Sequence, residues 1–70
     1  MKFEISRLMT PQGTFKLVGE LIHSDDQQLI YHQAWFMGTD GWVELDISSP
    51  VTVSVLAQIK NTVIAHLLSD

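Results

Sequence analysis

The chain of 70 residues contains no cysteine and only four basic residues, and each shortage excludes a class of protein. Without cysteine there is neither a disulfide-stapled scaffold nor a cysteine-based zinc module. The four cations are Lys2, Arg7, Lys16 and Lys60. They are scattered, whereas binding to nucleic acid or to an anionic membrane needs concentrated basic side chains. Eight acidic residues bring the net charge to −4, which disfavours nucleic acid as a partner.

Long apolar stretches are also missing. The longest apolar runs are short pieces such as Ala34–Met37, far below the roughly 18 residues of a transmembrane helix. Charges at Lys2, Glu4 and Arg7 interrupt the segment where a signal peptide would need its apolar core. We therefore expect a cytoplasmic protein that does not associate with a membrane.

What the chain does have is enough apolar residues, 46%, to form a core. No repeat, linker or charge block divides it, so we predict a single domain over residues 1–70. A domain of this size buries only roughly 60% of the surface of its unfolded chain and is marginally stable. Oligomerisation is a common remedy in a chain without disulfides, which favours a homodimer.

Turn signals divide the first two-thirds of the chain into four strand-like segments. Thr10–Gly13 combines proline with glycine, Ser24–Gln27 is a polar break, and Gly38–Gly41 contains an Asp-Gly hairpin pair. The segments around these turns alternate apolar and polar residues; they are Lys2–Met9, Thr14–His23, Gln28–Met37 and Trp42–Ile47. Because short loops join antiparallel neighbours, we predict a four-stranded antiparallel meander over residues 2–47.

A helix is predicted after the sheet, over about residues 50–68. Ser49 is a favourable cap, and Pro50 is favoured at the first helical position. One apolar stripe has helical spacing; it consists of Thr52, Leu56, Ile59, Val63 and Leu67. The predicted fold class is thus α+β, in the order ββββα, with one C-terminal helix packed on one face of the sheet. A fifth strand over Val51–Val55 with a shorter helix behind it is the alternative, because β-branched residues alternate there.

Loop lengths predict the register of the last three strands, including pairs of Leu21 with Ile30 and Glu20 with Tyr31. The helix-facing side then receives Phe15, Leu17, Leu21, Ile30, Ala34, Phe36, Val43, Leu45 and Ile47. The opposite side receives Val18, Ile22, Leu29, Tyr31, Trp35, Met37 and Trp42, with Lys16, Glu20, Glu44 and Asp46 among them. The first strand is left unassigned, because a bulge or a three-residue turn at Pro11 would switch the face of its side chains.

No motif in the chain supports catalysis, metal binding or a cofactor. The three histidines, His23, His32 and His66, lack the spacing of metal ligands. We expect His32 to pack opposite Gly19, and the carboxylates of Glu44 and Asp46 to be solvated. Nucleophile elbows and phosphate-binding glycine loops are also absent from the sequence. We therefore predict a protein that is not an enzyme, with no metal and no cofactor.

The side of the predicted sheet opposite the helix holds both tryptophans and the tyrosine, and we call it the aromatic face. It carries the strongest functional signal. Tyrosine and tryptophan are enriched at protein interfaces. The predicted function is a small non-catalytic protein-interaction module (an adaptor, inhibitor or assembly subunit). We expect it to be a homodimer joined through this face or through the broad apolar arc of the helix. The predicted partner-binding residues are Tyr31, Trp35, Met37, Trp42 and Glu44.

Two alternative functions use other chemistry. Single-stranded nucleic acid would stack its bases on the aromatic face. Acidic mimicry of nucleic acid would place carboxylates in a basic partner site; the candidates are Glu20, Glu44, Asp46, Asp25 and Asp26. The small number of acidic residues ranks mimicry below ordinary protein binding.

Overall fold

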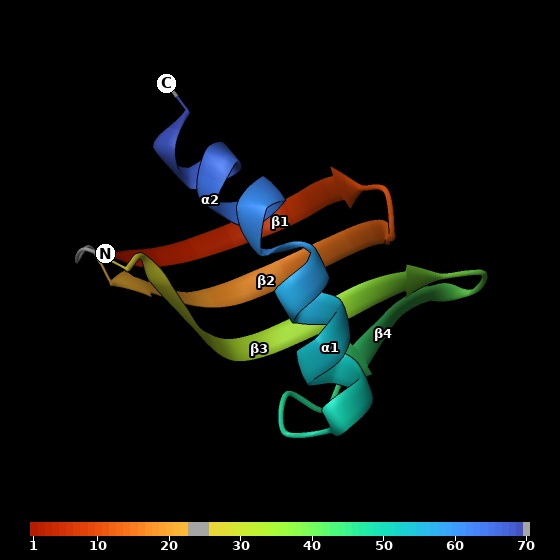
Figure 1. Ribbon diagram of the computed structural model, residues 1–70. Helices are drawn as coiled ribbons and strands as arrows, with labels where there is room; N and C mark the ends of the chain where they lie inside the picture. The colour runs from red at the N-terminus through yellow and green to blue at the C-terminus, as the bar shows by residue number, and fades with distance from the viewer. Residues whose placement is uncertain (23–25, 70) are drawn as a thin grey trace.

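The computed structural model describes residues 1–22 and 26–69 and shows four strands followed by two helices (Figure 1). The sheet is antiparallel in the order β1-β2-β3-β4, with bounds Lys2–Thr10, Gly13–Ile22, Gln28–Gly38 and Gly41–Leu45. Both helices, α1 (Pro50–Gln58) and α2 (Lys60–Leu68), lie against the same face of this sheet. The predicted α+β meander is confirmed. A fifth strand over residues 51–55 is wrong, because α1 contains that segment.

Glycine-containing turns close the first and last hairpins tightly. Thr10 pairs with Gly13, whose φ of +135° lies in a region that favours glycine. The Thr10 hydroxyl donates to the Gly13 carbonyl at 2.8 Å and accepts from the Gln12 amide at 3.1 Å. In the β3–β4 hairpin Gly38 pairs with Gly41, so the loop has two residues where four were predicted.

The predicted register holds between β3 and β4 but only in part between β2 and β3. All predicted β3–β4 pairs are present. The β2–β3 pairs hold as far as Val18, and the register shifts by one residue between Val18 and Gly19. A bulge at His32 causes the shift, and Gly19 therefore pairs with Tyr31. The predicted positions of His32 opposite Gly19 and of Tyr31 opposite Glu20 are wrong.

This bulge exchanges the two faces of the first half of β3. Leu29 and Tyr31 lie on the helix side, where they pack against the core, whereas Ile30 is 43% exposed. The predicted faces of these three residues are wrong, because a one-residue shift turns each side chain to the other face. Gly19 lets the strands approach closely, since a Cβ at this position would collide with the Ile30 carbonyl oxygen.

A second bulge, in β1, determines which side chains of this strand face the helices. The register shifts between Ile5 and Leu8, so both of these side chains are buried on the helix side. The two residues between them, Ser6 and Arg7, oppose Lys16 and are both exposed. Ile5 and Leu8 thus both face the core, although three positions instead of two separate them along the strand.

The core lies between the sheet and the helices. Ten apolar side chains are buried there: Phe3, Ile5, Leu8, Phe15, Leu17, Leu21, Ala34, Leu56, Ile59 and Val63. The predicted helical stripe is confirmed, because its first four residues are buried and Leu67 packs against the core.

A bend of 51° at Ile59 separates the two helices, so the single helix predicted over 50–68 is wrong in this respect. The Ile59 amide still donates to the Val55 carbonyl at 3.2 Å, and the Ile59 carbonyl accepts from the Val63 amide at 3.0 Å. The bend keeps one stripe in contact with the sheet, because it redirects α2 toward β1 (Figure 1). Among the described residues, no single helix is long and apolar enough to span a membrane, and α1 and α2 reach that length and composition only together.

A turn anchored by Asp46 leads into α1. The Asp46 carboxylate accepts from the Ser48 amide at 3.0 Å and from the Ser48 hydroxyl at 2.7 Å. These hydrogen bonds lower the pKa of Asp46 from its usual value. Ser49 and Pro50 take their predicted places at the start of α1, but the Ser49 side chain makes no capping hydrogen bond. Because β4 ends at Leu45, the prediction that the sheet extends to residue 47 is wrong.

Candidate functional site

The sheet face that points away from the helices is the candidate site, which we call the outer face. Both helices lie against the opposite side. The buried apolar side chains of the described residues form one core cluster that includes side chains of both the sheet and the helices. No element within the described part of the chain therefore covers the outer face (Figure 1). A single layer of helices buries only one face of a sheet.

Four of the five predicted site residues gather on this outer face. Trp35 pairs with Glu44, and Met37 pairs with Trp42, so all four lie at the β3–β4 hairpin. Trp42 is 36% exposed, and Trp35 is half-buried. The register thus brings two large apolar rings to a surface that no described element covers.

Lys16 completes this cluster from β2. It pairs with Trp35, and its Nζ lies 4.4 Å from the centre of the Trp35 ring and 5.5 Å from that of Trp42. An ammonium over an indole ring is attracted by about 0.5–1 kcal/mol at an exposed site. Sequence reasoning placed Lys16 on this face but not among the site residues. Its position opposite Trp35 was the signal that it joins the aromatic cluster.

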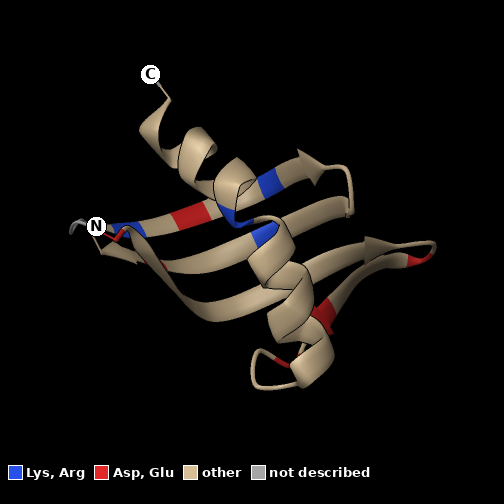
Figure 2. Cartoon of the chain, in the orientation of Figure 1, with Lys and Arg blue, Asp and Glu red and all other residues tan. Residues whose placement is uncertain are grey.

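On the outer face, the charge changes sign along one row of cross-strand neighbours that runs from β1 to β4. Arg7 on β1 lies opposite Lys16, while Glu44 lies at the other end of the row on β4, with Trp35 between them. Next to this row, Met9 on β1 is 76% exposed. Figure 2 shows basic and acidic positions interspersed along the strands, whereas the helices are almost free of charge. The row therefore has a basic end at β1 and an acidic end at β4.

Tyr31 lies on the helix side of the sheet, so its predicted place beside Trp35 is wrong. Its ring meets the ring of Phe3 edge-on, with the centroids 6.3 Å apart. The hydroxyl is buried and has no hydrogen-bond partner among the described residues. Burial raises the pKa of Tyr31 from 10.0 to about 12, so the phenol stays protonated at pH values where a free tyrosine ionises.

The other candidate residues do not form a chemical centre. On the outer face, His32 Nε2 lies 3.3 Å from Glu20 Oε1. Asp46 lies beyond the end of β4, in the turn before α1, where its carboxylate is bound to Ser48. Within residues 1–22 and 26–69, no group of three His, Asp or Glu side chains is placed to hold a metal ion. His23 and Asp25 lie outside the described residues.

Comparisons with protein-family models, with curated proteins and with solved structures gave no match to this chain. The geometry of the chain itself is therefore the basis for inferring its function.

Proposed function

We propose that the chain is a small non-catalytic protein-interaction module that forms a homodimer through its outer face. The cluster of Lys16, Trp35 and Trp42 on an uncovered sheet face carries this proposal. A few residues contribute most of the binding energy at a protein interface, and tryptophan is enriched among them. An uncovered tryptophan face is therefore better explained by a protein partner than by solvent.

The charge pattern of the outer face favours a second copy of the chain as that partner. In a dimer with a two-fold axis parallel to the strands, β1 of one copy lies over β4 of the other. Arg7 of one copy then faces Glu44 of the other, and Met9 faces Trp42. Because the two-fold axis repeats each contact, a basic end meets an acidic end at both edges of the interface.

The size of the domain points the same way. A standard protein interface buries about 800 Å² per partner, which is about a sixth of the 4688 Å² surface of this chain. Among the described residues, ten apolar side chains are buried. A small domain with such a limited core is stabilised when a dimer removes further apolar surface from water.

The same geometry gives less support to the two alternative functions. Bases of single-stranded nucleic acid would stack on the indole faces, but the Lys16 ammonium already lies over both rings. Acidic mimicry needs carboxylates gathered on one surface. Glu20 is instead beside His32, and Asp46 is bound to Ser48 in a turn.

Removal of both indoles tests the interface. We expect Trp35→Ala with Trp42→Ala to raise the dimer dissociation constant by roughly 1,000-fold or more, because tryptophans that anchor an interface contribute about 2 kcal/mol or more each. Sedimentation equilibrium measures this constant, and circular dichroism shows whether the variant is folded. Val51→Ala, at a position 73% exposed on α1, is the control. A folded double variant that dimerises normally, or a control that does not dimerise, would contradict the proposal.

A charge exchange tests how the two copies are oriented. Arg7→Glu and Glu44→Arg each place like charges opposite one another across the two-fold axis, so each weakens the dimer by about tenfold. The chain that carries both substitutions restores the attraction and dimerises nearly as tightly as the original. If the double variant is no tighter than the single variants, β1 does not lie over β4.

A further inference from the structure

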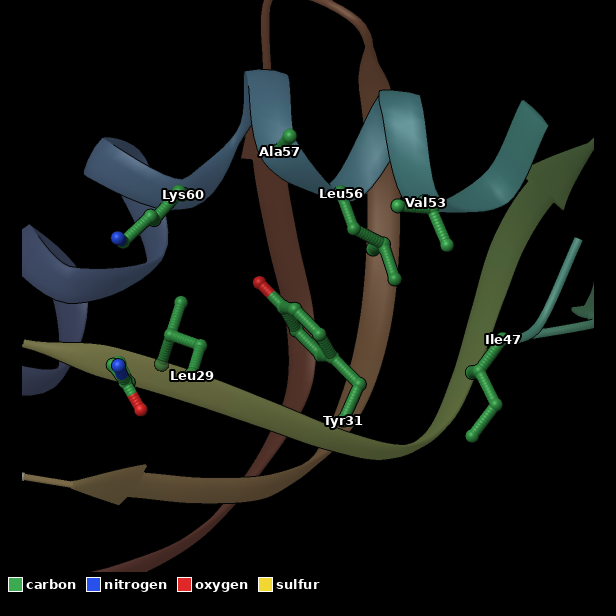
Figure 3. A pocket seen from close by; sticks show the side chains of 8 residues that line it. Leu29, Tyr31, Ile47, Val53, Leu56, Ala57 and Lys60 are labelled. Atoms are coloured by element: carbon green, nitrogen blue, oxygen red, sulfur yellow. The ribbon is translucent and has the colours of Figure 1, made fainter. Parts of the chain in front are cut away.

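A cleft lies between α1 and the sheet, on the side opposite the outer face (Figure 3). Its volume of about 370 Å³ falls within the roughly 300–1,000 Å³ of small-molecule sites. Leu29, Ile47 and Leu56 give it apolar walls, and Lys60 is the charged residue that lines it. This combination of apolar walls and few polar groups is typical of a site that binds a small ligand.

The Tyr31 hydroxyl is the unsatisfied group of this cleft. Figure 3 shows the ring rising from β3, with its oxygen directed toward the underside of α1. The phenol is a hydrogen-bond donor, and its oxygen is buried with no partner among the described residues. A buried donor without an acceptor is unfavourable, so a ligand that supplies an acceptor gains an interaction that the protein alone does not satisfy.

Lys60 supplies a positive charge near this donor. It is the first residue of α2, directly after the bend at Ile59, and its side chain lines the cleft. In Figure 3 its ammonium lies on the same side of the Tyr31 hydroxyl as Leu29. A hydroxyl donor together with an ammonium is suited to a carboxylate, which accepts hydrogen bonds and carries the opposite charge.

We propose that this cleft binds a small amphipathic carboxylate, such as a medium-chain fatty acid. The hydrocarbon chain lies against Leu29, Ile47 and Leu56, and the carboxylate accepts from the Tyr31 hydroxyl and pairs with Lys60. Because the hydroxyl is closed to solvent in the empty cleft, a neighbouring wall side chain moves when the ligand enters. The proposal is independent of the homodimer, since the cleft and the outer face lie on opposite sides of the sheet.

Titration with octanoate tests the site directly. We expect a single saturable site with a dissociation constant on the order of 1 mM or tighter, given the usual affinity per atom of small ligands. Amide chemical shifts in two-dimensional NMR are expected to change at Leu29, Leu56 and Ala57. Acetate, which has the carboxylate without the hydrocarbon chain, should bind at least tenfold more weakly.

Two substitutions distinguish the contribution of the Tyr31 hydroxyl to octanoate binding from that of the Lys60 charge. Tyr31→Phe weakens octanoate binding by about tenfold, because it removes the hydrogen-bond donor. In the protein without octanoate, the same substitution raises the denaturation midpoint, because it removes a buried group that has no hydrogen-bond partner. Lys60→Gln weakens octanoate several-fold and reduces the dependence of binding on salt. Lys2→Gln removes an equal charge from β1 and leaves octanoate binding unchanged.

Three results would overturn the carboxylate site. They are the absence of chemical-shift changes in the cleft, non-saturable shifts spread over the surface, and equal octanoate affinity of Tyr31→Phe and the original chain. None of these results bears on the dimer. The indole and charge-exchange variants are measured without octanoate, so failure of one proposal is distinguishable from failure of the other.

Discussion

Trp35 on the outer face and Tyr31 in the cleft differ in their surroundings more than in the type of side chain. Trp35 and Tyr31 both belong to β3, but the bulge at His32 turns them to opposite faces. Trp35 lies beneath the Lys16 ammonium on the outer face. Tyr31 is turned toward α1, and its hydroxyl is buried without a partner in the described part of the chain. One inserted residue thus assigns one ring to a surface and the other to a cleft.

Burial of Tyr31 predicts how the protein responds to alkaline pH. Its pKa is raised from 10.0 to about 12 by burial in the folded state. Between these two values the unfolded chain releases the phenolic proton while the folded chain retains it. The free energy of unfolding therefore falls as the pH rises from about 10 to 12 and is unaffected by this group below 10.

Ultraviolet absorbance measures this directly, because the chain contains a single tyrosine. We expect tyrosinate to appear at a midpoint near pH 12 in the folded protein and near 10 in denaturant. A folded protein whose tyrosine titrates near pH 10 would mean that the hydroxyl is open to solvent.

At the scale of elements, loop lengths predict the register only where two strands pair without a bulge. Leu29 and Tyr31 are two residues apart, as are Ala34 and Phe36, but the two pairs differ in parity. Because both pairs pack against the core, β3 contains a bulge between them. The sequence does not reveal it, since Trp35 and Met37 continue the parity of Leu29 and Tyr31. Loop counting assumes an unbroken ladder, so it predicted the β3–β4 register correctly but gave the wrong face for the first half of β3.

The bend at Ile59 had no comparable signal in the sequence. Kinks are usually attributed to proline or glycine, and neither occurs between residues 51 and 68. The helical stripe was predictable from its spacing. Its division into two helices accompanies the contact of α2 with β1, which is a property of the tertiary structure.

We therefore expect Ile59 to contribute strongly to the free energy of unfolding. The side chain is fully buried at the bend, so Ile59→Ala should lower the free energy of unfolding by roughly 2–5 kcal/mol through lost burial and a cavity. Urea denaturation at a fixed protein concentration measures the loss. Val51→Ala, in the first turn of α1 and 73% exposed, should cost less than about 1 kcal/mol. Similar losses for both variants would show that the bend is not packed on the core.

At the scale of the whole molecule, the helices cover one face of the sheet, and no element in residues 1–22 and 26–69 covers the other. The sequence was sufficient to predict this imbalance, because one helical segment follows four strands that contain two tryptophans. It was not sufficient to predict the cleft beneath α1, which depends on the shifted register and the bent helix together. The outer face and the cleft are thus separate surfaces, and we propose a different ligand for each: a second copy of the chain for the outer face and a small carboxylate for the cleft.

The molar mass of the unsubstituted chain in solution tests the central claim most directly. Light scattering behind a sizing column, repeated over a range of protein concentrations, distinguishes a monomer of 7.9 kDa from a dimer. We predict about twice the monomer mass, with dissociation only on dilution. A mass of 7.9 kDa at every concentration would contradict the homodimer and leave the outer face without its proposed partner.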